Sequence, residues 1–146
     1  MRLRIALLMG TVFSLAVVGA ATAGSASAAS WFTYGYSTCT FYTETPVVTF
    51  GYGGTTNVQA QARVTCGNSL VMSFQVCTGS TANPSYPERC VPYTVPIAGG
   101  SSIRRLGGEQ TAVNNALYYS RVKAYGYVAT TGCWAYTPLG LRGVIC

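Results

Sequence analysis

The sequence predicts an all-β protein: an antiparallel β-sandwich, or alternatively a small β-barrel, stapled by three disulfides. Several short segments alternate apolar and polar residues, which is typical of half-buried strands. Glycine and proline separate these segments, and almost no helical periodicity is present. The chain also holds six cysteines. Many short strands with frequent turns favour two packed antiparallel sheets.

The first 28 residues resemble a secretory signal peptide. Two arginines precede a mainly apolar run, and small residues surround Ala26-Ser27-Ala28. The apolar run is shorter than the roughly 20 residues that a membrane-spanning helix needs. We therefore expect cleavage after Ala28, leaving residues 29–146 as a single secreted, extracellular β domain.

The charge of that domain is mild. Nine basic residues less Arg2 and Arg4 leave seven, and three glutamates give 7 − 3 = +4. These cations are scattered along the chain, whereas nucleic-acid binding favours clustered ones. We expect no nucleic-acid partner and no stable membrane insertion.

All six cysteines lie in the predicted mature part. An even number in an exported chain indicates disulfides. Metal binding is disfavoured, because the chain has no Cys-x-x-Cys motif and neither His nor Asp. The sequence supports no cofactor.

The aromatic segment 30–42 is predicted to be one strand. Its even positions carry Phe32, Tyr34, Tyr36 and Tyr42, and its odd positions are mostly small. We expect the rings to point into the core. The alternative is an exposed arm that binds a partner or ligand through Trp31, Tyr34 and Tyr36.

The segments 57–66 and 70–77 alternate most clearly. Gly67-Asn68-Ser69 separates them, so we expect a hairpin. The segment 78–89 is predicted to be a loop because it contains Pro84 and Pro87. It ends at Arg89, and closure by a disulfide would make it rigid enough to present to a partner.

Two further segments carry candidate binding residues. Pro92 and Pro96 place the extended segment 90–97 at a sheet edge. The segment 98–110 is predicted to be a glycine-flanked loop, with Arg104 and Arg105 near its tip.

The segment 116–130 is predicted to be the longest strand. Two cations on one face are costly to bury, so that face is expected in solvent. Exposed tyrosines beside arginine are typical of interfaces, although cross-strand tyrosine pairs also merely stabilise sheets. The face carries Leu117, Tyr119, Arg121, Lys123, Tyr125 and Tyr127.

Three disulfides are predicted. A turn centred on Leu139-Gly140 would place Cys133 opposite Cys146, at a distance that a disulfide can bridge. Cys77–Cys90 would close the proline-rich loop. Cys39–Cys66 then follows by elimination.

The residue inventory disfavours catalysis. Without His or Asp, the usual acid–base and nucleophile arrangements cannot form. Glu44, Glu88 and Glu109 each occur in a stretch predicted to be turn or loop, so we interpret them as solvated surface acids. We expect no enzyme activity.

The whole predicted mature chain resembles small exported β-sandwich proteins of actinobacteria, including inhibitors, antimicrobial proteins and adaptor subunits of secreted toxin particles. The signal peptide, "WFTYGYSTCTFY", "VQAQARVTCGNSLVMSFQVC" and the six cysteines carry this resemblance. It implies a protein-binding module whose partner is another secreted or cell-surface protein. Two alternatives are a glycan- or cell-wall-binding protein that stacks sugars on Trp31, Tyr34, Tyr36 or Trp134, and, less favoured, a direct antimicrobial.

The third disulfide gives a direct test. A peptide map of the unreduced, exported chain should recover Cys133 and Cys146 in one crosslinked pair, which reduction separates. Finding these two cysteines in different crosslinks would contradict the assignment.

Overall fold

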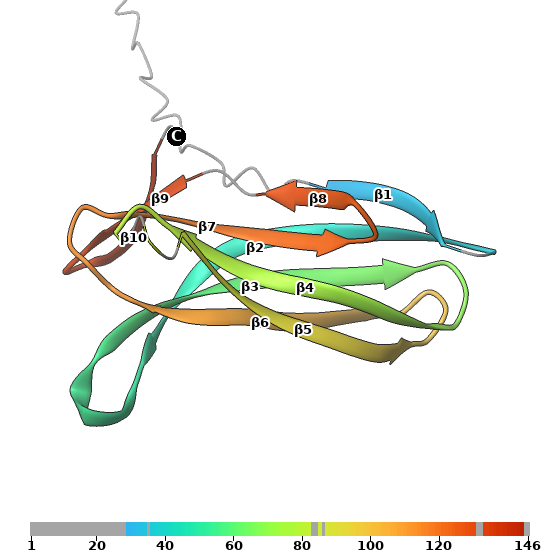
Figure 1. The fold of residues 1–146 in the computed structure, drawn as a ribbon, viewed down its shortest axis with the longest axis horizontal. Coiled ribbons are helices and arrows are strands. Elements are labelled where there is room, and N and C mark those ends of the chain that lie inside the picture. The colour runs from blue at the N-terminus through green and yellow to red at the C-terminus, as the bar shows by residue number, and fades with distance from the viewer. Residues whose placement is uncertain (1–28, 35, 83–84, 86, 131–132, 145–146) are drawn as a thin grey trace, which may run out of the picture.

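The computed structural model is an antiparallel β-sandwich whose two sheets do not close into a barrel (Figure 1). It describes residues 29–34, 36–82, 85, 87–130 and 133–144, and for residues 29–34 only the backbone. The sandwich prediction is thus confirmed over the barrel alternative. The predicted signal peptide, residues 1–28, lies outside the described residues. In the part that is described, no helix has the length and apolar character to cross a membrane.

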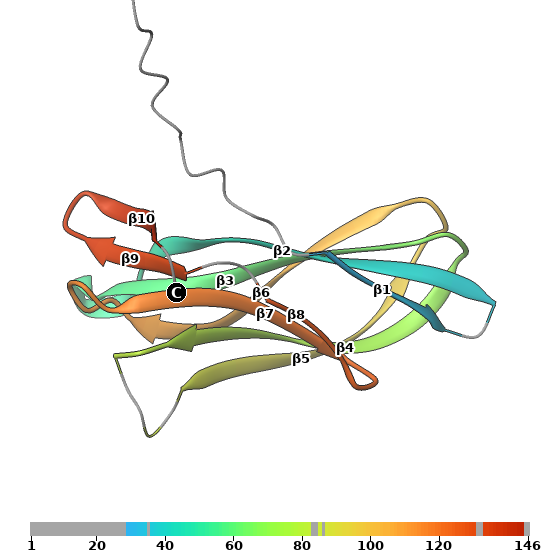
Figure 2. The same cartoon turned by 90° about the horizontal axis from the view of Figure 1, so that it is seen from above.

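We name the two sheets A and B. Sheet A has the strand order β1-β2-β3-β6, and sheet B has the order β10-β9-β7-β4-β5, with β8 paired to β7. The β9–β10 hairpin lies at one end of the sandwich and the β1–β2 turn at the other (Figure 2). The elements are β1 (Ala29–Tyr34), β2 (Ser37–Phe50), the 3-10 turn η1 (Tyr52–Gly54), β3 (Thr56–Cys66), β4 (Leu70–Ser80), β5 (Glu88–Ile97), β6 (Ser102–Thr111), β7 (Leu117–Ala124), β8 (Tyr127–Thr130), β9 (Cys133–Thr137) and β10 (Gly140–Val144).

The alternation in β3 and β4 correctly predicts the core, but the predicted hairpin between them is wrong. The apolar faces of both strands are buried between the sheets, and Phe74 contacts Phe41 at a ring separation of 6.0 Å. However, β3 belongs to sheet A and β4 to sheet B, so residues 67–69 carry the chain across the sandwich. Periodicity identifies the buried face of a strand and not its neighbour.

The opening aromatic segment forms a hairpin rather than one strand. Tyr34 pairs with Ser37, so the chain reverses between β1 and β2. In β2 the residues that point inward are the odd ones, including Cys39 and Phe41, while Tyr36 is 76% exposed. The expectation of inward rings at the even positions is therefore wrong for the described side chains. The Cys39–Cys66 disulfide lies in the core and so directs the odd face inward.

The predicted long strand is also a hairpin. The backbone turns at Tyr125 (φ 48°) and Gly126 (φ 85°), and β8 returns along β7. Positive φ at both central residues is the requirement of a type I′ turn, which matches the twist of paired strands. Only four residues of the predicted face, Leu117, Tyr119, Arg121 and Lys123, therefore lie on one strand.

The predicted glycine-flanked loop is instead strand β6, at the edge of sheet A. Arg104 and Arg105 lie within this strand and not at a loop tip. Gly107 and Gly108 form a bulge, because these two residues together oppose Ala60 of β3. Glycine pairs can thus mark a bulge inside a strand as well as a loop.

The proline-containing strand β5 lies at the edge of sheet B, as predicted. The narrow Cys77/Cys90 pair, with a Cα–Cα distance of 4.0 Å, is a non-hydrogen-bonded one. By alternation, Pro92 and Pro96 occupy the same class of position. Their missing N–H groups would face away from β4, so the prolines remove donors from the open edge.

Two of the three predicted disulfides are confirmed. Cys39–Cys66 joins β2 to β3, and Cys77–Cys90 joins β4 to β5. In each case the cysteines lie directly opposite one another in the strand register.

The third predicted disulfide involves Cys146, which lies outside the described residues, so this pairing stays a prediction. The turn proposed for it is wrong, because Thr137 pairs with Gly140 and Pro138-Leu139 is the turn. Cys133 faces Val144 in this register. With Pro138 in the turn, its missing N–H costs no ladder bond.

A hydrogen bond joins the two sheets where β2 and β6, the strands on either side of β3, both have a bulge. Thr45 and Pro46 of β2 oppose Ala60 from one side, and the Gly107-Gly108 bulge opposes it from the other. The Ala60 N–H donates across the sandwich to Thr78 Oγ1 of β4, at 2.8 Å. A Cβ on Gly107 would lie 2.9 Å from that oxygen, so glycine permits the close approach.

Replacing Thr78 by Val should lower the free energy of unfolding by about 1–3 kcal/mol. Valine has the shape of threonine but leaves the buried Ala60 N–H without its acceptor. Urea denaturation of the oxidised protein measures the change. Thr38→Val, the same substitution at an exposed position of β2, should stay within about 0.5 kcal/mol. Equal effects of the two substitutions would contradict the role of Thr78.

Candidate functional site

A charged cluster on the outer face of sheet B begins with a row of three residues from adjacent strands. Gly79 of β4 pairs with Glu88 of β5 on one side and with Tyr119 of β7 on the other. A Cβ on Gly79 would lie only 1.9 Å from Tyr119 Cζ, so the tyrosine ring occupies the space above the glycine. Tyr119 Oη then donates to Glu88 Oε1 at 3.4 Å.

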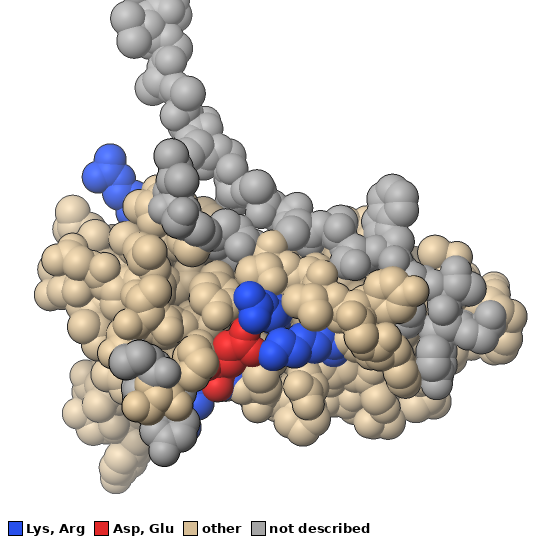
Figure 3. Space-filling view, turned by 45° about the horizontal axis from the view of Figure 1, so that its top comes forward, with Lys and Arg blue, Asp and Glu red and all other residues tan. Residues whose placement is uncertain are grey.

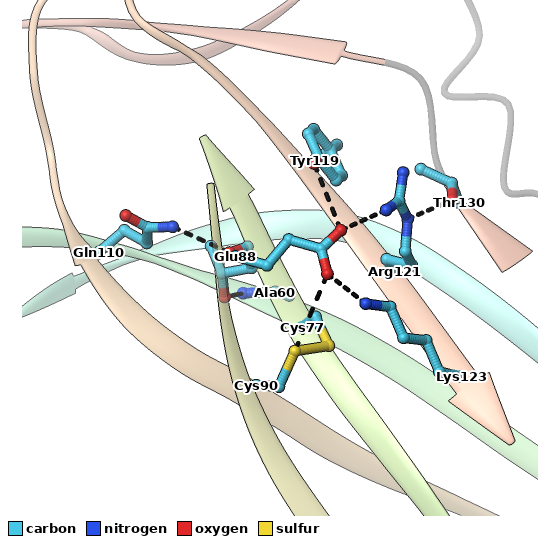
Figure 4. The surroundings of a disulfide bond; sticks show 10 residues. Ala60, Cys77, Glu88, Cys90, Gln110, Tyr119, Arg121, Lys123 and Thr130 are labelled. Carbon is cyan, nitrogen blue, oxygen red and sulfur yellow. Dashed lines mark hydrogen bonds and ion pairs between the residues drawn. A yellow bond between two sulfur atoms is a disulfide. The ribbon is translucent and has the colours of Figure 1, made fainter. Parts of the chain in front are cut away.

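Two cations of β7 complete this cluster. Arg121 donates to Glu88 Oε1 and Lys123 to Glu88 Oε2, as Figure 4 shows. Arg121 also donates through Nε to Thr130 Oγ1 of β8 at 3.0 Å. Its guanidinium carbon lies 5.0 Å from the centre of the Tyr119 ring. Glu88 is thereby held from two directions, and its side chain is 14% exposed.

The environment changes the proton affinity of Tyr119. Burial raises the pKa of its phenol above the usual value near 10. The charge of Arg121 opposes this rise, while Glu88 adds to it through its charge and its hydrogen bond. Tyr119 therefore stays a neutral hydrogen-bond donor throughout the physiological pH range.

The Cys77–Cys90 disulfide lies beside Glu88, with Cys90 Sγ 4.0 Å from Glu88 Oε2 (Figure 4). The two sulfurs and the carboxylate group within 4.8 Å of one another, as metal ligands do. Both sulfurs are bonded to each other, so neither is a thiolate that could hold a metal. The arrangement is a structural support for Glu88.

A groove of about 510 Å³ continues from Lys123 along the same face. Ser73 and Gln75 of β4 and Pro92 of β5 line it, and the β7–β8 turn forms its other wall. On that wall three side chains are half exposed: Tyr125 (51%), Tyr127 (45%) and Val128 (52%). The space-filling view shows acidic and basic side chains meeting on a face that is otherwise mainly uncharged (Figure 3).

The structure brings four of the predicted binding residues together on this face, Tyr119, Arg121, Lys123 and Tyr125. Tyr127 also lines the groove, but it pairs with the buried Ala124, so alternation assigns it to the other face of the sheet. Trp31 and Tyr34 lie in β1, whose side chains are outside the described part. The remaining four lie elsewhere: Tyr36, which donates to Ser69 O at 3.0 Å; Arg89, which lies against Gly108; Arg104, whose Nε is 2.7 Å from Glu44 Oε2; and Arg105, which lies over the Tyr93 ring.

The prediction of a turn or loop is wrong for all three glutamates, since Glu109 too lies in a strand, β6. The interpretation as solvated surface acids is wrong for Glu88 and Glu44. Both lie in strands, both form ion pairs, and the side chain of Glu44 is 19% exposed. The predicted Cys77–Cys90 disulfide could have placed Glu88 in a strand next to β4. If these cysteines face each other across two strands, then Gly79 faces Glu88, and the glycine leaves room for the Tyr119–Glu88 contact.

No family model, no curated protein and no solved structure matches the chain.

The raised pKa of Tyr119 predicts a distinct alkaline titration. In ¹³Cζ-tyrosine NMR, the resonance that Tyr119→Phe removes should titrate above pH 10. The folded pKa exceeds the unfolded one, so stability is complete below pH 10 and falls as the pH rises from the unfolded towards the folded pKa. Tyr119→Phe should make this alkaline decline shallower. A Tyr119 resonance that titrates at or below pH 10 would contradict the burial argument.

Proposed function

We propose that the chain is a secreted, non-catalytic protein-binding module of the adaptor, inhibitor or toxin-complex type, and that the outer face of sheet B is its binding surface. One observation carries the proposal: Tyr125, Tyr127 and Val128 remain half exposed on a tight hairpin beside a groove. Exposed aromatic side chains that a tight turn holds in place are typical of interface anchors. Holding them before binding lowers the ordering cost of association.

The charged cluster supports the same role. Tyrosine and arginine are enriched at interfaces, and here Tyr119 and Arg121 are held in place by Glu88. A surface whose polar groups are already ordered loses little side-chain entropy when a partner binds.

The contacts of the three glutamates support a non-catalytic function. Glu88 is occupied by two cations, and Glu44 lies between Arg63 and Arg104. Glu109 accepts a hydrogen bond from Asn57 Nδ2 at 3.1 Å. With no His or Asp in the chain, a pair of carboxylates free for acid–base work is not available among the residues that the structure describes.

Export is supported by the disulfides. Cys39–Cys66 and Cys77–Cys90 each cross-link neighbouring strands, and such bonds persist in oxidising compartments. Together with the resemblance of residues 1–28 to a signal peptide, they favour an extracellular protein.

A pair of matched tyrosine variants tests the proposal. Crosslinking capture from the culture medium of the producing organism and its competitors should recover a stable partner with the wild-type chain. Tyr127→Ala should reduce that capture at least about tenfold, as expected when an aromatic anchor is truncated. Tyr36→Ala is the control, because Tyr36 is equally aromatic and 76% exposed but lies on the β1–β2 turn.

Three results would contradict this function. They are failure to recover any partner, equal loss of capture in the Tyr36 and Tyr127 variants, and retention of the chain on chitin or peptidoglycan with no protein captured. The last result would favour the glycan-binding alternative instead.

A further inference from the structure

Strand β7 pairs with only part of strand β4. Strand β4 pairs with β5 from Leu70 to Gly79, but with β7 only from Gln75 to Ser80. At Tyr125-Gly126 the chain turns away from β4 to form β8. Among the described strands, none takes the place that β7 leaves beside Leu70–Phe74.

Backbone groups of β4 point towards this vacated place. Because Cys77 and Cys90 form a narrow, non-hydrogen-bonded pair, every second residue of β4 directs its N–H and C=O away from β5. Val71 and Ser73 belong to that set. Among the described residues, the Ser73 N–H donates to Tyr125 Oη of the neighbouring hairpin, with a long N···O distance of 3.4 Å. Val71 and Ser73 thus present a short edge to which another strand can pair.

The β5 edge of sheet B is unsuited to such pairing. There, Pro92 and Pro96 stand at the outward-facing positions of β5 and have no N–H to donate. Strand addition on the β5 side of β4 is therefore disfavoured, whereas no proline lies beside Val71 and Ser73.

Apolar side chains surround the same place. Val71 is 60% exposed, and Tyr125 and Val128 are half exposed on the neighbouring hairpin. Domains that bind by strand addition combine a backbone edge with contacts for alternate side chains of the added strand. The groove beside Ser73 supplies such a contact.

The charge of the partner follows from the lining of the groove. Lys123 is the charged residue among those that line it, and its side chain is 37% exposed. Without the predicted signal peptide, the chain carries a net charge of 7 − 3 = +4. Its glutamates Glu44 and Glu88 are neutralised by two cations each. A carboxylate is therefore the complementary group for a partner to bring.

We propose that the partner binds by adding a short antiparallel strand beside Val71 and Ser73 of β4, in line with β7, and that this strand carries an acidic side chain directed at Lys123. The occupant is an extended acidic segment of another protein. The inference rests on the proposed function and names its binding mode.

The test uses phage-displayed random 12-residue peptides selected against the oxidised chain. Selected peptides should be rich in Asp or Glu, and Val71→Pro should weaken their binding about tenfold or more, because proline removes the N–H at the vacated edge. Thr94→Pro is the control, since it removes an N–H from the open edge of β5. It should change affinity less than about twofold.

A matched pair of variants tests the contact between Lys123 and the acidic side chain of the partner. Lys123→Gln should weaken binding of the acidic peptides about threefold or more, and Arg104→Gln, on the outer face of sheet A, should leave it unchanged. Equal effects of the two variants would overturn the acidic part of the proposal.

Two measurements avoid reliance on a variant that fails to fold. On the wild-type chain, the Val71 amide should become protected from hydrogen exchange when peptide binds, and the Thr94 amide should not. N-methylation of the peptide at alternate residues should abolish binding, whereas methylation at the intervening residues should not. No selected peptides, unchanged binding to Val71→Pro, or an unprotected Val71 amide would each overturn strand addition. A captured partner that tolerates Val71→Pro would do so while leaving the proposed function intact.

Discussion

The hydrogen bond between the Ala60 N–H and Thr78 Oγ1 is the constraint on which the arrangement of the sheets depends. β2 and β6 both insert an extra residue opposite Ala60, so β3 is flanked by bulges on both sides. A buried N–H without an acceptor would cost about 1–3 kcal/mol, and Thr78 of the opposite sheet supplies the acceptor. Gly107 lets the sheets approach closely enough for this bond. The contact therefore sets where β4 lies relative to sheet A.

The charged cluster follows from that placement because side chains alternate along a strand. With Thr78 directed inward, Cys77 and Gly79 must point outward. Cys77 then forms a disulfide with Cys90. Because Gly79 has no side chain, the Tyr119 ring can lie above it and contact the Glu88 carboxylate. One face of β4 thus joins the sheets, while the other supports the candidate site.

The sequence predicts well which face of a strand is buried, but poorly which strands pair with each other. Alternation correctly identifies the buried residues of β3, and loop closure and elimination give both disulfides that the structure describes. It cannot show that β3 and β4 lie in different sheets, because pairing depends on contacts far apart in the chain. The Gly107-Gly108 pair predicts a loop equally well as a bulge, and Tyr125-Gly126 marks a turn only because both residues adopt positive φ.

The edges of the sandwich explain why the candidate surface lies where it does. An open strand edge invites pairing with other chains, so soluble sheets block theirs with proline, charge or irregular geometry. β5 is blocked by Pro92 and Pro96, and the bulge at Gly107-Gly108 interrupts β6. β4 is an interior strand, so its edge opens only because β7 turns at Tyr125-Gly126 before it reaches the N-terminal part of β4. That turn also exposes the Tyr125 ring, and one local backbone conformation therefore produces both the unpaired backbone and the aromatic side chain beside it.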